Sequence, residues 1–517
     1  MNQSSHSGRV LYGRTLLLVV LAAGLPLALM SCGSSSPKAV ASQPSLTQIS
    51  SDPYTVSPMQ HATEVEPHMV AFGATLVATF QTGRVGNTPD WYGGATDTGW
   101  ATSTDSGMTW KHGFLPGLTQ SQGTSTGPYD SVSDPVVAYD AKHGVWMIAS
   151  LPVLNPVLNT QPNLPAVVVN RSTDGGFTWQ NPVSVGTPGK WDKNWFACDN
   201  WPNSPFFGNC YMQWNDDVSG QFQMSTSSDG GQTWGPAIAP DMAVGLGGEP
   251  VVQSNGTVVV PFKSQGNGLS AFTSSDGGAT WSVPATISAI QVHSVAGLLR
   301  ASVLPSAAVD GTGNIWVVWQ DCRYRAVGVK CSSNDLVYST SADGIHWSAV
   351  ARIPIDPVTT TVDHFIAGVG IDPTTSGSGA HVAIHYYYYA QSNCTTATCE
   401  LSIGYIASGN GGSTWNAAVT LAGPMQLSWL PTSNSGYMVG DYVATVFNNG
   451  VPHGVFAVAG QNAGTTFNEA IYTAQGLTAA LQGPQFSSAG DKPLHHVSDP
   501  IDWELKPRSR HAKRSAH

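Results

Sequence analysis

Several charged residues stand where a short polar stretch of the chain passes into an apolar run. They are Glu66, Asp134, Asp192, Glu249, Arg300, Asp363 and Asp441. If these runs are the innermost strands of a repeated unit, the charges meet in one place. Carboxylates that lie together can transfer protons, and an arginine guanidinium can bind an anion. We therefore expect a ligand site on that face. The alternative is that the charges line a water-filled channel and cap strand ends.

A short pattern, S-x-D-x-G-x-T-W, identifies the repeated unit. Close copies begin at Ser103, Ser172, Ser227 and Ser274, and weaker ones at Ser341 and Ser408. The Asp side chain accepts backbone N–H bonds in a tight turn, and the Gly takes a conformation that other residues resist. The Trp then buries a large ring under the turn. So many copies do not arise by chance, and we interpret the pattern as structural.

The segments around each copy predict the fold. Two apolar runs precede a copy and a third leads into it, as in SDPVVAYD, GVWMIAS and PAVVVNRSTDGG. With one more strand after the Trp, each unit is a four-stranded antiparallel blade of about 60 residues. We predict an all-β fold, a β-propeller with seven blades. Six blades is the alternative. The last unit lacks an obvious outer strand, and the segment before Glu66 is expected to supply it and close the ring.

The repeated pattern is that of the Asp box, and residues of about 64–474 resemble the sialidase superfamily of BNR-repeat propellers. The resemblance implies a propeller, usually of six blades, with the box aspartates on the rim in a structural role. It also implies a Tyr nucleophile partnered by a Glu, an Asp general acid and three arginines on the substrate carboxylate. A Tyr suits this chemistry because a carboxylate nucleophile would be repelled by the acidic sugar.

Parts of that catalytic set match this chain. Glu249, in Gly-Glu-Pro, resembles the Glu that activates the nucleophile, and Tyr442, which follows Asp441 in the last unit, resembles the nucleophile itself. Asp90 lies after the second strand of the first unit, where the resemblance places the general acid. Asp134, in Ser-Asp-Pro, resembles a second-blade motif of the sialidase site.

The arginines match poorly. The family's F-R-I-P is replaced by an acidic segment ending Glu66-Pro67, and Lys263 stands where a second Arg is expected. A Lys does not reproduce the bidentate grip of an Arg on a carboxylate. The predicted substrate-binding residues are Arg300, Lys263, Asp134, Arg84 and Asp441. In the third unit, Asp192 and Lys193 form an axial ion pair in one interpretation and belong to a disulfide-pinned loop in another.

The N-terminus indicates export. Arg9 and Arg14 precede an apolar run from Leu16 to Met30, which is typical of a signal peptide over residues 1–31. The sequence up to Cys32 resembles a bacterial lipobox, which implies acylation of Cys32 and anchoring to the outside of the bacterial envelope. An ordinary signal peptide is the alternative. We expect a flexible tether over residues 32–60, the propeller over 61–482 and a polar, basic tail over 483–517.

Cysteines other than Cys32 fall in neighbouring pairs. They are Cys198 with Cys210, Cys322 with Cys331, and Cys394 with Cys399. An even number in an exported protein predicts disulfides, and the short separations favour the neighbour pairing. The spacings are irregular and no His cluster accompanies them, so we predict no metal site and no cofactor.

The charge and the motifs leave three functions open. A formal net charge of −11 argues against a nucleic-acid partner. We expect a monomer that meets the membrane only through its lipid anchor. The first function is a sialidase-like glycoside hydrolase, an exo-α-sialidase acting on terminal sialic acid or a related glycan. The second is a non-catalytic cell-surface propeller that binds glycan or protein. The third is a glycosidase that uses paired carboxylates such as Glu249 and Asp134 on an uncharged sugar.

Overall fold

The computed structural model describes residues 44–55, 59–86, 93–120, 127–153, 165–327 and 330–494. These residues belong to one compact unit, Gln43–His517. Apart from two 3-10 turns, Gly377–Gly379 and Leu427–Trp429, their regular elements are strands, so the predicted all-β class is confirmed. None of the helical segments among them is long and apolar enough to cross a membrane.

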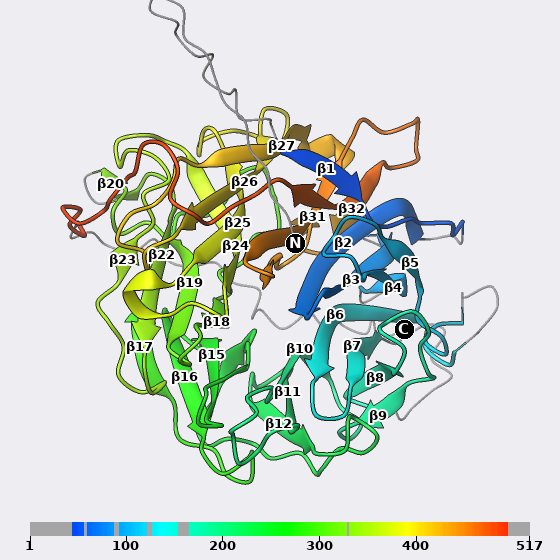
Figure 1. Cartoon of the computed structure of the whole chain (residues 1–517). Coiled ribbons are helices and arrows are strands. Elements are labelled where there is room, and N and C mark those ends of the chain that lie inside the picture. Colours follow the sequence, from blue (N-terminus) through cyan, green and yellow to red (C-terminus); the bar gives the residue numbers. More distant parts are fainter. Residues whose placement is uncertain are drawn as a thin grey trace, which may run out of the picture. The chain divides into compact units, whose positions relative to one another are not determined.

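The strands form antiparallel meanders that follow one another along the chain (Figure 1). The first consists of β2 (Met59–Phe72), β3 (Thr75–Val85), β4 (Ala95–Ser103) and β5 (Lys111–Phe114), and the second of β6 (Ser131–Asp140), β7 (Val145–Val153), β8 (Val167–Ser172) and β9 (Val183–Val185). The pair Ala95–Val132 joins these two into a single sheet. The third consists of β10 (Trp191–Cys198), β11 (Cys210–Asp216) and β12 (Phe222–Ser227).

Four more sheets complete the series. The fourth consists of β13 (Gly245–Leu246), β14 (Val251–Val252), β15 (Val258–Ser264), β16 (Gly268–Ser274) and β17 (Ala285–Ala289), and the fifth of β18 (Ser306–Val309), β19 (Ile315–Asp321), β22 (Asp335–Ser341) and β23 (Ala351–Arg352). The sixth consists of β24 (Asp363–Ile371), β25 (Val382–Tyr389), β26 (Glu400–Ser408) and β27 (Val419–Gln426). The last consists of β30 (Ala444–Asn448), β31 (Val451–Ala459), β32 (Glu469–Gln475) and β1 (Ser45–Gln48). Two small hairpins, β20 (Ala326–Val327) with β21 (Lys330–Cys331) and β28 (Thr432–Ser433) with β29 (Gly436–Tyr437), lie outside these sheets.

The innermost strands close a ring. β2, β6, β10, β14, β18, β24 and β30 each contact the next, and β30 contacts β2. Figure 1 shows the sheets fanning outward from these strands. The molecule is therefore a β-propeller, as predicted. The number of blades stays a prediction, because the first two sheets are joined and the third has three described strands.

The last sheet takes its outer strand from the start of the folded unit. β1 pairs antiparallel with β32, Ser45 opposite Gln475 and Gln48 opposite Tyr472. This confirms that the segment before Glu66 supplies the missing strand. Because β1 lies inside the range predicted as a tether, the folded unit begins ahead of residue 61.

Residues just beyond 482 also contact the sheets. Phe486 pairs with Trp415, and Leu494 donates its backbone N–H to the carbonyl of Arg323. The described part of the predicted tail, up to Leu494, thus lies against the fifth and sixth sheets. The rest of the tail, with its basic cluster, lies outside the described residues.

The Asp boxes are turns held by the Asp side chain, as the sequence predicts. In one of them Asp174 Oδ1 accepts the backbone N–H of Thr178 at 2.9 Å and Oδ2 accepts the Thr178 hydroxyl at 2.6 Å. Gly176 has φ of +87°, a conformation that favours glycine. In the box that starts at Ser408, Asn410 replaces the Asp: its Oδ1 accepts the backbone N–H of Thr414 at 2.9 Å, and its Nδ2 donates to the Thr414 hydroxyl at 2.9 Å.

The neighbour pairing of the cysteines is confirmed. Disulfides join Cys198 to Cys210, Cys322 to Cys331 and Cys394 to Cys399. Three disulfides fit an extracellular protein. The proposed lipidation residue Cys32 lies outside the described residues.

Candidate functional site

Bulges in the innermost strands turn several side chains toward the axis. Glu66, Asp134, Lys193 and Ile366 have φ of 53°, 47°, 51° and 48°, which is rare for residues other than glycine. Each stands at a break in strand register, on β2, β6, β10 and β24 respectively. A bulge of this kind re-aims a side chain and is common beside functional sites. The bulges thus place two acids and a lysine at matching positions around the axis.

Asp441 is the centre of a buried ion-pair cluster. Arg300 holds its carboxylate bidentately, with Nε 2.6 Å from Oδ1 and Nη2 hydrogen-bonded to Oδ2. Lys193 Nζ donates to the same Oδ2 and lies 3.7 Å from Oδ1 of Asp134. Although burial opposes it, the charges of Arg300 and Lys193 hold the pKa of Asp441 well below its usual range. Burial likewise opposes the Lys193 charge, but Asp134 and Asp441 raise the Lys193 pKa above its ordinary value.

Glu66 lies beside this cluster and is hydrogen-bonded to Gln81, which in turn is bonded by Arg84. Gln81 donates its amide N–H to Glu66 Oε2, and Arg84 Nη1 donates to Gln81 Oε1 at 2.8 Å and to the carbonyl of Gly94 at 3.0 Å. Burial and the nearby Asp134 raise the pKa of Glu66 to about 8. Burial and the charge of Arg300 lower the pKa of Arg84 to about 10. Arg84 therefore lies near the axis but is held by the first sheet.

Tyr442 is buried with its hydroxyl turned to the backbone. The hydroxyl donates to the carbonyl of Pro135 at 3.2 Å. Its ring meets the edge of Trp195, with 4.9 Å between ring centres. Burial and the neighbouring carboxylates, first of all that of Glu66, raise the Tyr442 pKa well above 10. This environment favours the neutral phenol.

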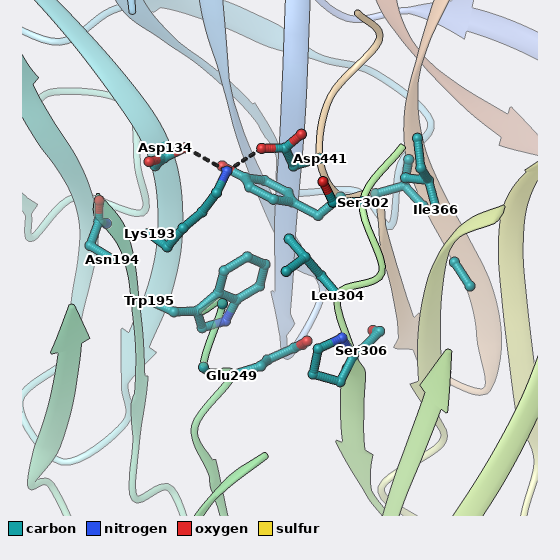
Figure 2. Close-up of a pocket in the computed structure, with 16 residues that line it drawn as sticks. Asp134, Lys193, Asn194, Trp195, Glu249, Ser302, Leu304, Ser306, Ile366 and Asp441 are labelled. Carbon is teal, nitrogen blue, oxygen red and sulfur yellow. Dashed lines mark hydrogen bonds and ion pairs between the residues drawn. The ribbon is translucent and has the colours of Figure 1, made fainter. Parts of the chain in front are cut away.

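Glu249 lies on the other side of Trp195. Burial raises its pKa to about 8, and a hydrogen bond from the backbone N–H of Ala307 opposes that rise. Figure 2 shows Trp195 and Leu304 between the Lys193–Asp441 pair and Glu249. Among the described residues, the recorded hydrogen bond of the Tyr442 hydroxyl goes to Pro135 rather than to Glu249.

A small cavity joins these residues. It has about 30 Å³ of space, enough for a few water-sized atoms, and Asp134, Lys193, Trp195, Glu249, Asp441 and Tyr442 line it. Figure 2 shows Asp134 and Asp441 on either side of the Lys193 ammonium. Asn194 also lines the cavity, and neither its amide nitrogen nor its amide oxygen has a partner among the described residues, although the side chain is buried.

Some of the predicted site residues lie together at the axis, and others do not. Asp134, Arg300, Asp441, Tyr442 and Glu249 are brought together at the axis. Lys263 is buried on β15 and is not one of the residues that line the cavity. Asp90 lies outside the described residues, so the general acid stays a prediction.

Two features of the site differ from the sequence expectation. Asp192 and Lys193 were interpreted either as an axial ion pair or as part of a disulfide-pinned loop, and in the structure both lie on β10. Lys193 pairs with Asp441, while Asp192 accepts the backbone N–H of Lys193 at 3.0 Å. Trp195 and Asn194 were not predicted as site residues. Their position directly after a bulge residue is the signal that identifies them.

A separate group of side chains has the spacing of a metal site. Asp335, Asp356 and His364 place ligand atoms within 4.8 Å of one another. Arg325 and Arg352 both form ion pairs with Asp335 and Asp356. These cations already neutralise the acids, and the group is a buried ion-pair network.

Comparisons with known proteins find similarities only among solved structures, all at low sequence identity. No protein-family model matches the sequence, and no curated protein matches it. The solved structure of an intramolecular trans-sialidase from Ruminococcus gnavus is 12% identical, with a TM-score of 0.39, and the match covers 78% of this chain and 91% of that one. The NanB sialidase from Streptococcus pneumoniae is 13% identical, with a TM-score of 0.40 and coverage of 83% and 70%.

A sialidase from Trypanosoma rangeli is 11% identical, with a TM-score of 0.38 and coverage of 84% of this chain and 60% of that one. These are likenesses of fold alone.

Proposed function

We propose that this protein is an exported, lipid-anchored propeller that binds an uncharged glycan at its axial cavity and does not hydrolyse sialosides. Of the functions open from the sequence, this is the non-catalytic one. The observation that carries the proposal is that the two axial cations already have a carboxylate partner. Arg300 and Lys193 are both bonded to Asp441. An anionic sugar would have to displace a buried carboxylate that already has ideal bidentate geometry.

The environment of Tyr442 supports the same conclusion. A phenol becomes a nucleophile when a neighbouring base takes its proton or when its pKa falls. Here the hydroxyl is bonded to a carbonyl and the pKa is raised. Glu249, the expected partner, lies beyond Trp195 and carries a pKa of about 8, which makes it a proton donor rather than a base at neutral pH.

The groups that remain suit neutral hydroxyls. Asn194 offers an amide donor and acceptor that have no partner within the described part of the chain, and Trp195 offers a partly exposed aromatic ring. Buried amides without partners are rare, because each costs free energy unless a ligand or water satisfies it. A sugar over the cavity inserts one hydroxyl beside Asn194 and packs its ring against Trp195.

A fluorogenic sialoside and a glycan array test the proposal together. We expect wild-type turnover equal to that of the Tyr442→Phe variant, and binding to at least one neutral glycan that Asn194→Ala weakens at least tenfold. Turnover that Tyr442→Phe abolishes would establish the sialidase instead. Turnover of a neutral glycoside that Glu249→Gln abolishes would establish the paired-carboxylate glycosidase. If no glycan on the array binds and a protein is captured from envelope extracts, the function is protein binding instead.

A further inference from the structure

A second space along the axis, larger than the small cavity, lies on the opposite side of Trp195 from the charge cluster. It is a channel of about 300 Å³, lined by residues of β2, β6, β10, β18, β24 and β30 and by Glu249 and Pro250, which precede β14. Trp195, Glu249, Ser306 and Val443 line both this channel and the small cavity described above, so they form the division between the two.

The channel extends toward the face that carries the Asp boxes. On β2 its lining begins at His68 and ends at Ala71, one residue before the strand ends at Phe72. The next strand starts at Thr75, and its neighbour Leu76 pairs with Ser103, the first residue of an Asp box. The channel is therefore separate from the blade-start face on which the proposed glycan site lies.

Small side chains create this space. The walls include Ala71, Ala138, Ala308, Gly370 and Ala444, each from a different innermost strand. Valines and Phe447 fill the positions between them. Most of the lining side chains are apolar, and the volume of the channel is at the lower end of the range for small-molecule sites. Such a lining favours an apolar group, because burying it removes apolar area from water.

Two polar groups of the channel, His68 and Glu249, lie at the Trp195 end, and Tyr139, Asn200 and Thr445 also line the channel. His68 Nδ1 accepts the backbone N–H of Val137 at 3.1 Å, so the neutral ring carries its proton on Nε2. Burial lowers the His68 pKa to about 3, which keeps the ring neutral. The ring packs edge-on against Trp195, with 4.7 Å between centres. Glu249 is at the same end, and burial raises its pKa to about 8.

These groups select a ligand by charge. An imidazole N–H and a protonated carboxyl donate hydrogen bonds to a neutral oxygen. They provide no counter-charge for an ionised head group, whose burial without a partner costs several kcal/mol. Size, apolar walls and a neutral polar end therefore point to one class of occupant.

We propose that the channel binds a small uncharged molecule with an apolar body and a hydroxyl or amide head, the head at His68 and Glu249 and the body between the alanines. The proposal does not rest on the proposed glycan site, although Trp195 and Glu249 line both spaces.

Isothermal titration of the folded protein with 1-hexanol, hexanoate and hexylammonium at pH 6.5 tests the proposal. We expect 1-hexanol to bind once per chain, and the two charged probes to bind at least tenfold more weakly. Ala308→Leu and, from another wall, Ala71→Leu fill the channel and should each weaken 1-hexanol at least tenfold. Ala279→Leu, on an exposed Asp-box loop, is the matched control and should leave binding unchanged.

Circular dichroism establishes that each variant is folded. If only one of the two channel variants folds, that variant alone tests the proposal. Absence of saturable 1-hexanol binding to the wild type would overturn the proposal. Equal binding to the wild type and to both channel variants would also overturn it, because the alcohol would then occupy another surface. Neither result decides the sialoside and glycan tests, because Ala71 and Ala308 line the channel and not the small cavity.

Discussion

Arg300 and Asp441 form a bidentate, buried ion pair, with Nε 2.6 Å from Oδ1. Asp441→Ala removes the shared partner of Arg300 and Lys193 and leaves two charges without it. We expect the free energy of unfolding to fall by about 3–5 kcal/mol, the usual cost of breaking a buried pair. Urea denaturation measures this. Asp441→Asn keeps the shape and part of the hydrogen bonding, so its loss should be smaller, and equal stability of Asp441→Ala and the wild type would contradict the cluster.

Glu249 makes stability depend on pH. Its pKa is raised from 4.5 to about 8 in the folded state. The folded chain therefore holds a proton that the unfolded chain releases above pH 4.5, and the associated stability is lost as pH rises toward 8. Between these values the loss is about 1.4 kcal/mol per pH unit for this group. Glu249→Gln cannot ionise, so urea denaturation at pH 5 and pH 8 should show a smaller fall than in the wild type. Parallel falls in the two proteins would refute this assignment.

The Asp boxes should affect stability and leave ligand binding unchanged. Asp174 accepts bonds from the backbone and hydroxyl of Thr178. We expect Asp174→Ala to cost about 1–3 kcal/mol, because it leaves these donors without their acceptor. Asp174→Asn should cost much less, since Asn410 already occupies the same position in another box. Thermal unfolding compares the three proteins, and a change in glycan binding by Asp174→Ala would show that the box reaches the site.

Ser50 fastens the N-terminal segment to the last sheet. Its hydroxyl donates to Glu64 Oε2 at 2.7 Å and accepts the backbone N–H of Ile471 at 2.8 Å. Ser50→Ala leaves both buried groups without this partner and should cost roughly 1–3 kcal/mol. Ser51→Ala is the control, because the contact of Ser51 with His112 is exposed and long at 3.3 Å. Equal melting temperatures for the two variants would show that the closure at Ser50 does not contribute to stability.

The sequence predicts the fold well because the repeat is stabilised by interactions between residues close in sequence. Each Asp box combines a turn, a glycine and a tryptophan at fixed spacing, and this local pattern needs no knowledge of distant contacts. The disulfide partners are likewise close in sequence. The pairing of β1 with β32 followed from one missing strand in the last unit.

The site is less predictable because its contacts join distant parts of the chain. Lys193 and Asp441 are 248 residues apart, and which acid the lysine meets depends on a bulge that flips its side chain inward. Sequence position placed Glu249 and Tyr442 at the axis, but Trp195 and Leu304 lie between the Lys193–Asp441 pair and Glu249. Lys263 lies on β15 itself and is not one of the residues that line the cavity.

The central claim is that Asp441 already binds the two axial cations, Arg300 and Lys193. Titration with carboxylates tests this claim most directly. Acetate and N-acetylneuraminic acid are titrated into the wild type and into Asp441→Ala, with acetamide as the neutral control. We predict no saturable binding of either acid to the wild type. Acetate should bind to Asp441→Ala and raise its melting temperature, while acetamide does neither. Binding of N-acetylneuraminic acid to the wild type as tightly as to Asp441→Ala would contradict the account.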